Sequence, residues 1–119
     1  MYRRTSSDSL TRLWIEPKKN RVSGAELFDS LRFVQLETTP ESMFDYVRCL
    51  KLLNGKFYLL DRMGTKLLCF DRDGKFLKKF EARGNGPDEY FMLCFLAADP
   101  VSKKILVADD VVRKIFIFD

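Results

Sequence analysis

Short apolar runs, separated by turn residues, dominate the chain from about residue 46 onward. Runs of this length that are rich in aromatic and β-branched side chains predict β-strands. Asn54-Gly55 and Asp71-Arg72-Asp73-Gly74 favour tight hairpin turns, because glycine readily adopts positive φ. The sequence therefore predicts an all-β body with strands at residues 46–53, 56–61, 66–70, 75–80, 92–98, 104–108 and 114–118.

This body contains a repeat. Residues 54–71 align with residues 102–119 at a constant offset of 48 positions, without a gap. Four aligned pairs are identical and six more keep apolar character; the identical pairs are Asp61/Asp109, Lys66/Lys114, Phe70/Phe118 and Asp71/Asp119. Four short strands and a 48-residue period are typical of a β-propeller blade. We therefore expect part of a ring whose blades are four-stranded antiparallel meanders: a first blade with its crossover loop at 42–90, and an incomplete second blade at 91–119 with three strands.

The side chains within the runs predict how the strands are covered. Residues 67–70 and 115–118 are apolar at every position, which predicts strands covered on both faces. Residues 75–80 include three lysines, which is typical of a partly solvated edge strand. Because two blades cannot close a ring, the chain reads as a fragment that self-associates or needs further blades. A monodisperse monomer in gel filtration would count against this interpretation.

The first 41 residues follow a different pattern. Residues 1–22 read as a flexible basic leader, with a short edge strand at 10–16. Ser23-Gly24-Ala25-Glu26 matches a capping box, so a short helix is expected at about 24–30. Residues 31–37 alternate and predict a lead-in strand, which Pro40 helps to end.

Charge and composition exclude several classes of function. Residues 1–22 carry six basic and two acidic residues, which accounts for the whole net charge of +4. The body then lacks the basic surplus of a nucleic-acid-binding domain. No apolar run approaches 18 residues, so no transmembrane segment is expected. The three cysteines lie in apolar runs and the chain has no histidine, so neither a metal site, a cofactor nor a catalytic constellation is predicted.

Three motifs could bind a phosphate, a calcium ion or another ligand. Each is better explained by a structural role in a turn or loop. Gly84-Asn85-Gly86 lacks the third glycine, the lysine and the helix start of a phosphate loop, so a tight crossover is expected. Residues 71–74 lack the remaining ligands of a calcium loop. The repeated Asp61/Asp109 and Lys66/Lys114 bracket a loop in both copies. We expect them to cap loop amides or to pair across the loop, with ligand contact as the alternative.

The sequence also resembles a known family. Residues 27–39, residues 59–76 and Gly84-Asn85-Gly86-Pro87-Asp88-Glu89-Tyr90 are similar to the six-bladed, NHL-like β-propeller proteins of Bacteroides-type bacteria. The resemblance implies about six blades in a longer, exported and often lipid-anchored protein, with the strand at 31–37 closing the ring. The chain departs from the pattern at Asp88, where the family often has glycine, and it lacks a lipoprotein signal with its cysteine.

In such propellers the loops after the second and fourth strands of each blade share one rim of the ring. The resemblance therefore implies a ligand-binding rim formed by Arg62, Thr65, Arg83, Asn85, Asp88, Glu89, Asp110 and Arg113. The preferred hypothesis is a non-enzymatic module that binds a protein, peptide or glycan there. The alternatives are a fragment of a propeller hydrolase or lyase, with catalytic residues in further blades, and a fragment without activity of its own.

Overall fold

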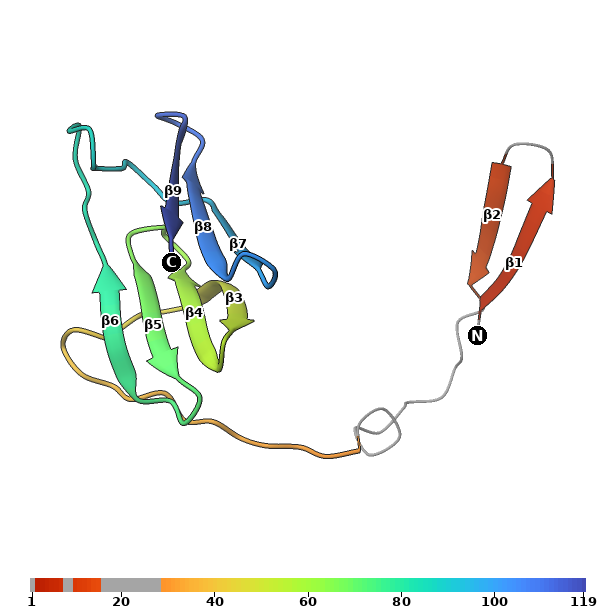
Figure 1. The fold of residues 1–119 in the computed structure, drawn as a ribbon, viewed down its shortest axis with the longest axis horizontal. Coiled ribbons are helices and arrows are strands. Elements are labelled where there is room, and N and C mark those ends of the chain that lie inside the picture. Colours follow the sequence, from red (N-terminus) through yellow and green to blue (C-terminus); the bar gives the residue numbers. More distant parts are fainter. Residues whose placement is uncertain (1, 8–9, 16–28) are drawn as a thin grey trace. The chain divides into compact units, whose positions relative to one another are not determined.

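The computed structural model describes residues 2–7, 10–15 and 29–119, and it divides into a unit of residues 1–33 and a unit of residues 34–119 (Figure 1). In the first unit, β1 (Tyr2–Ser7) pairs antiparallel with β2 (Leu10–Ile15). The strand predicted at 10–16 is confirmed, whereas its partner was not predicted; the flexibility of this segment stays a prediction. The helix predicted at 24–30 falls mostly outside the described residues, and no helix is present within them.

The second unit contains seven strands in two antiparallel sheets, which confirms the all-β prediction. The order in the four-stranded sheet is β3 (Val47–Leu53), β4 (Lys56–Asp61), β5 (Leu67–Asp71) and β6 (Phe76–Phe80). The order in the three-stranded sheet is β7 (Phe95–Asp99), β8 (Lys104–Asp109) and β9 (Lys114–Phe118). The bounds of β8 are those of β4 moved by 48 positions, so the repeat in the sequence is also a repeat in the fold.

Glycine and asparagine shape the tight turns as predicted. In the β3–β4 turn, Asn54 has φ 52° and Gly55 has φ 70°, which a two-residue hairpin turn of the mirror-image type requires. Gly74 has φ 89° in the β5–β6 turn, where its N–H donates to the Asp71 carbonyl at 3.1 Å. Lys103, the residue equivalent to Gly55 in the second copy, keeps the left-handed conformation at φ 58°. The second turn is nevertheless longer, because four residues, 100–103, join β7 to β8, whereas two residues join β3 to β4.

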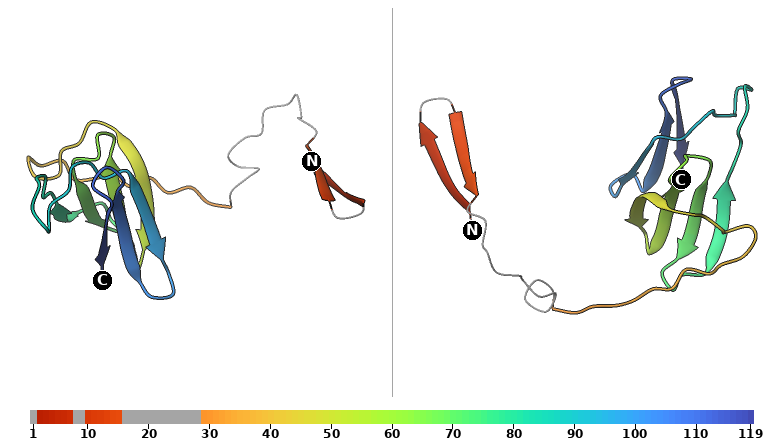
Figure 2. Two further views of the ribbon diagram at one scale, coloured as in Figure 1. Left: turned by 90° about the horizontal axis from the view of Figure 1, so that it is seen from above. Right: turned by 180° about the vertical axis from the view of Figure 1, so that it is seen from behind.

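The two sheets stack and enclose the main core (Figures 1 and 2). Leu60 and Leu67 of the first sheet are buried with Leu96, Ile105 and Val107 of the second. A smaller cluster of Leu59, Leu68 and Phe70 covers the other face of the first sheet, with Leu36 and Phe44 packed against it. The run at residues 67–70 is thus buried on both faces, as predicted.

The equivalent run in β9 does not follow this prediction. Phe116 and Phe118 pack against the core, but Ile115 is 67% exposed and Ile117 is 58% exposed. The alternation of a strand places these two side chains on the outer face of the second sheet, and no described segment covers that face as Leu36 and Phe44 cover the first sheet. Self-association of the chain, expected from uncovered faces, stays a prediction.

The segment at residues 31–37 was predicted to be a strand and is not one in the structure. The Glu37 N–H donates to the Gly74 carbonyl at 2.8 Å, and its side chain accepts from the Phe76 N–H at 2.8 Å. The segment therefore attaches to the β5–β6 turn rather than to the length of a strand, and a turn offers no ladder of partners. The expected partial propeller ring is likewise not shown: the second unit consists of two stacked sheets.

Gly64 provides a test of the packing between the β4–β5 loop and the segment that leads into β7. It has φ 65°, and a Cβ there would overlap the Leu93 carbonyl. We expect Gly64→Ala to lower the free energy of unfolding by at least about 2 kcal/mol, since backbone strain and a steric clash add. Gly55→Ala is the matched control, because φ is 70° there but nothing lies within 4 Å of the added Cβ; it should cost about 1 kcal/mol. Equal losses in urea titrations would contradict the close approach of Leu93.

Candidate functional site

Three loops meet at one end of the stacked sheets: the β4–β5 loop (62–66), the β6–β7 crossover (81–94) and the β8–β9 loop (110–113) (Figure 1). The crossover is hydrogen-bonded to the β4–β5 loop and to Lys114, the residue that follows the β8–β9 loop and begins β9. The Leu93 N–H donates to the Gly64 carbonyl at 2.8 Å, and the Lys114 ammonium group donates to the carbonyls of Gly86 and Glu89 at 2.5 and 2.9 Å. We call this end of the molecule the loop end.

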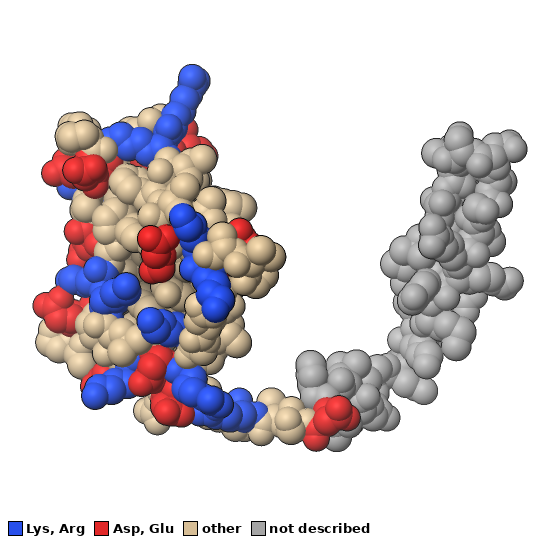
Figure 3. Space-filling view, in the orientation of Figure 1, with Lys and Arg blue, Asp and Glu red and all other residues tan. Residues whose placement is uncertain are grey.

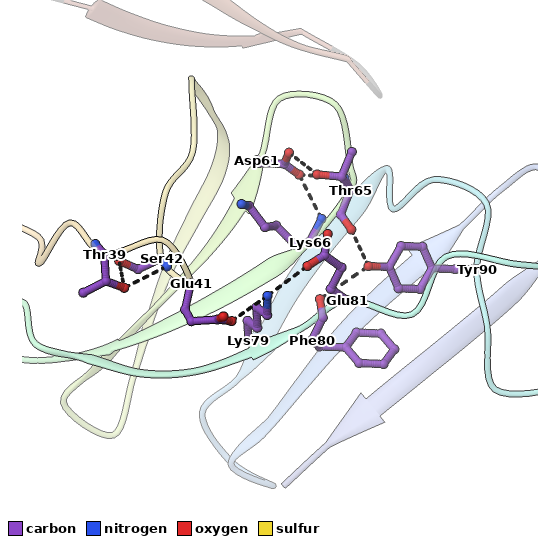
Figure 4. Close-up of polar contacts among 10 residues, drawn as sticks. All are labelled: Thr39, Glu41, Ser42, Asp61, Thr65, Lys66, Lys79, Phe80, Glu81 and Tyr90. Atoms are coloured by element: carbon purple, nitrogen blue, oxygen red, sulfur yellow. Dashed lines mark hydrogen bonds and ion pairs between the residues drawn. The ribbon is translucent and has the colours of Figure 1, made fainter.

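Asp61 holds the β4–β5 loop in place (Figure 4). One of its carboxylate oxygens accepts from the N–H groups of Thr65 and Lys66 at 2.7 and 3.1 Å. The other accepts from the Thr65 hydroxyl at 2.5 Å. Asp61 is 7% exposed, and its interactions match the predicted capping of loop amides.

Asp109, the repeat equivalent of Asp61, joins two loops. It is 1% exposed. One oxygen accepts from the N–H groups of Val111 and Val112 at 2.9 and 3.2 Å, and the other from those of Phe91 and Met92 at 2.5 and 2.8 Å. Burial raises the pKa of Asp109, but these four N–H groups outweigh it and hold the pKa below its usual value. The Asp109 carboxylate therefore has a structural role.

Tyr90 links the β6–β7 crossover to the first sheet. Its side chain is fully buried, and its hydroxyl donates to the Thr65 carbonyl at 2.5 Å and lies 3.4 Å from the Phe80 carbonyl (Figure 4). Burial raises the pKa of Tyr90 to about 12. Its ring lies 5.2 Å from that of Phe80 and 6.1 Å from that of Phe116. Tyr90 is thus a core residue, although it lies in a loop.

The structure brings the eight predicted rim residues to this end but gives them different surroundings. Thr65 and Glu89 are half-buried: Thr65 bonds to Asp61, and the Glu89 carboxylate accepts from the Gly86 N–H at 2.8 Å. Arg83 is exposed, and its side chain donates to the Phe91 carbonyl at 3.2 Å. The remaining five are exposed: Arg62, Asn85, Asp88, Asp110 and Arg113. Their role in binding a ligand stays a prediction.

An exposed cluster beside the β4–β5 loop was not predicted from the sequence. The Arg62 guanidinium carbon lies 5.5 Å from the centroid of the Tyr46 ring, a cation–π geometry. Tyr46 and Met63 are each 64% exposed. With Asp45 and Asp61 they line a pocket of about 140 Å³, which we call the Tyr46 pocket. The predicted strand began at residue 46, so Tyr46 was assigned to the strand and not to the surface cluster. Its position next to Asp45, ahead of the apolar run, was the signal for exposure.

The surface chemistry of the body is mixed. On the face seen in Figure 3, lysine and arginine are interspersed with aspartate and glutamate, without a continuous region of one sign. Among the described residues, no three His, Cys, Asp or Glu side chains are grouped so that they could hold a metal ion. In the same part of the chain, no helix is long and apolar enough to cross a membrane.

Comparison with known proteins corrects the expected family. A search of curated proteins gives no match. A solved structure from Bacteroides fragilis NCTC 9343, described as a "Putative exported protein", is similar with a TM-score of 0.66 and 26% identity. The similarity covers 76% of this chain and 25% of that one, so the chain spans about a quarter of the length of the structure it matches.

The predicted membership of the NHL-like propeller family is wrong, since the family model that matches is a different one. The prediction rested on the similarity of residues 27–39, 59–76 and 84–90 to that family. The matching model covers residues 15–119. The chain therefore belongs to the family described as "Domain of unknown function (DUF4934)".

Proposed function

We propose that the domain is a non-enzymatic binding module that takes a protein or peptide segment at the Tyr46 pocket. The observation that supports the proposal most is the exposed stack of Arg62 on Tyr46, next to the exposed Met63. Tyrosine, methionine and arginine are enriched in protein interfaces, and tyrosine and arginine often provide most of the binding energy. Phe91, 51% exposed, adds another aromatic group at the loop end.

The surroundings of the pocket support binding without a large ordering cost. Arg62 and Met63 lie in a loop held by the buried Asp61, and the Arg62 N–H donates to the Tyr46 carbonyl at 2.8 Å. A binding surface on a rigid loop loses less conformational entropy when a partner docks. The Arg62 guanidinium favours a partner with a carboxylate. Asp45 and Asp61 also line the pocket and disfavour further negative charge, so we propose a peptide segment with a single acidic residue, placed at Arg62, as the ligand class.

Selection of peptides from a random displayed library tests this proposal. Peptides that bind the full chain should be enriched in a single Asp or Glu. The double variant Tyr46→Ala/Arg62→Ala should bind them at least about tenfold more weakly, because truncating an aromatic or arginine at an interface centre costs more than 1 kcal/mol each.

The matched control removes one exposed apolar and one exposed basic side chain from the opposite end of the first sheet: Leu52→Ala/Lys56→Ala. It should bind as the unchanged chain does. Peptides that bind both double variants equally well would show that the Tyr46 pocket is not the site.

The solved structure from B. fragilis also supports export of this chain, since that protein is described in those terms. We propose an exported protein, which cell fractionation tests by locating the chain outside the cytoplasm. Lipid anchorage, implied earlier by the resemblance, has no support from the matching family. The hydrolase or lyase alternative stays untested.

A further inference from the structure

The Tyr46 pocket contains two opposite charges that do not neutralise each other. Arg62 and Asp45 both line the pocket, and both are exposed. Neither side chain forms an ion pair with another described residue. The pocket therefore offers a ligand a positive group and, separately, a negative group.

The position of Arg62 explains why the two charges stay apart. Its guanidinium carbon lies 5.5 Å from the centroid of the Tyr46 ring, and its backbone N–H donates to the Tyr46 carbonyl at 2.8 Å. A guanidinium group stacked on a ring keeps the N–H groups at its edge available for a carboxylate. The same stacking occupies that face of the ring, so a positive group of a ligand meets Asp45 rather than the face that Arg62 covers.

Asp61 adds negative charge to the pocket but does not compete with Asp45 for a ligand. It is 7% exposed, and its oxygens already accept from the N–H groups of Thr65 and Lys66 and from the Thr65 hydroxyl. The pocket thus has two carboxylates against one guanidinium, an excess of one negative charge. A ligand that carries only an acidic group gains from Arg62 but is repelled by both carboxylates, and a basic group on the same ligand offsets that repulsion.

Met63 suits the stem of a long charged side chain. It is 64% exposed and lines the same pocket. Lysine and arginine cover apolar surface with their methylene groups while the charged end stays in water, and the flexible methionine thioether adapts to such a contact. In an extended segment, side chains two positions apart lie on the same face. An acidic and a basic residue with this spacing both reach the pocket.

We propose that Asp45 is a specificity-determining residue of the Tyr46 pocket, and that the pocket selects an extended segment with two charges. The acidic residue of the segment pairs with Arg62, and a lysine or arginine two positions away pairs with Asp45. Complementary charges of this kind provide specificity more than affinity. The inference rests on the function proposed above, because it requires a peptide at this pocket.

Synthetic peptides test the inference on the full chain. Each has blocked ends and a glycine–serine host sequence around Glu-Gly-Lys or Lys-Gly-Glu, since the segment can run in either direction; in matched peptides Gln replaces Lys or Glu. Titration to about 2 mM, a range suited to weak binding, is followed by amide NMR. We expect shifts at Tyr46, Arg62 and Met63, with the better Glu/Lys peptide binding roughly two- to fivefold more tightly than its Lys-to-Gln counterpart. General attraction by the net charge of +4 would favour the Gln peptide instead.

Substitutions in the protein assign the preference to one carboxylate. Asp45→Asn should remove the preference for Lys over Gln, and Asp45→Lys should reverse it. Asp119→Asn is the matched control, because it removes an exposed carboxylate that follows β9 at the end opposite to the loop end, and it should leave the preference unchanged.

The outcomes separate this inference from the proposed function. Equal binding of the Lys and Gln peptides, or a preference that Asp45→Asn retains, would overturn the role of Asp45, while binding that Tyr46→Ala/Arg62→Ala weakens would still support a peptide site. Equal binding after Glu is replaced by Gln would show that Arg62 does not take the acidic residue. An absence of shifts at Tyr46 and Arg62 with every peptide would overturn both proposals.

Discussion

Replacing Asp109 with alanine is expected to lower the free energy of unfolding by at least about 3 kcal/mol, enough to unfold a domain of ordinary stability at moderate temperature. Its carboxylate accepts from four backbone N–H groups, two in the crossover and two in the β8–β9 loop. Because Asp109 is 1% exposed, its removal would leave these four N–H groups without an acceptor in the interior of the protein. Urea titration, followed by far-ultraviolet circular dichroism, measures the loss of stability.

The neighbouring residue provides the control. Asp110→Ala removes a carboxylate of the same kind from an exposed position and should change the free energy of unfolding by less than about 0.5 kcal/mol. Similar losses for the two variants would show that Asp109 does not hold the loops together. Asp61→Ala, with three donors in a single loop, should fall between them.

The pH dependence of the free energy of unfolding provides a second test of Asp109. Because the folded-state pKa of Asp109 lies below its ordinary value of 3.8, the stability from its charge is complete above that value and is lost as the pH falls through the folded pKa. The unchanged chain should therefore lose stability below about pH 4. Asp109→Asn should lose less over that interval, since the amide does not titrate there.

The strands were predictable because their signals are local. Asn54-Gly55 and Asp71-Arg72-Asp73-Gly74 fix the hairpin turns, and the 48-residue offset supplies an independent check on β4 and β8. The errors arose where the outcome depends on neighbours. Residues 31–37 have the alternation of a strand, but their backbone hydrogen bond, from the Glu37 N–H to the Gly74 carbonyl, goes to the β5–β6 turn, so they form no ladder. Ile115 and Ile117 have the pattern of a covered strand, but no described segment covers them.

The same distinction applies to the candidate site. The repeat of Asp61 and Asp109 correctly indicated loop capping, since a residue repeated at equivalent positions of a fold supports that fold. Nothing local distinguished Thr65 and Glu89, whose side chains bond within the loops, from Arg62, which is exposed. The burial of Tyr90 was also not predictable, because it depends on Phe80 and Phe116, from different sheets, meeting around one ring.

Truncating Tyr90 to alanine is the second substitution for which we expect a large effect, a loss of about 3 to 5 kcal/mol, as for other buried aromatic side chains. The ring is fully buried between the sheets. Its removal leaves a cavity next to Phe80 and Phe116 and releases the crossover from the Thr65 carbonyl. Thermal and urea unfolding of the purified chain measure the change.

Two further variants separate the ring from the hydroxyl. Tyr90→Phe keeps the packing and removes the hydrogen bond to Thr65, so it should cost about 1 to 2 kcal/mol. Tyr46→Ala truncates an exposed tyrosine and should cost less than about 1 kcal/mol. If Tyr90→Phe destabilised the chain as much as Tyr90→Ala, the hydroxyl would be the main link. The stacked sheets would then depend on one polar contact rather than on the packing of the aromatic core.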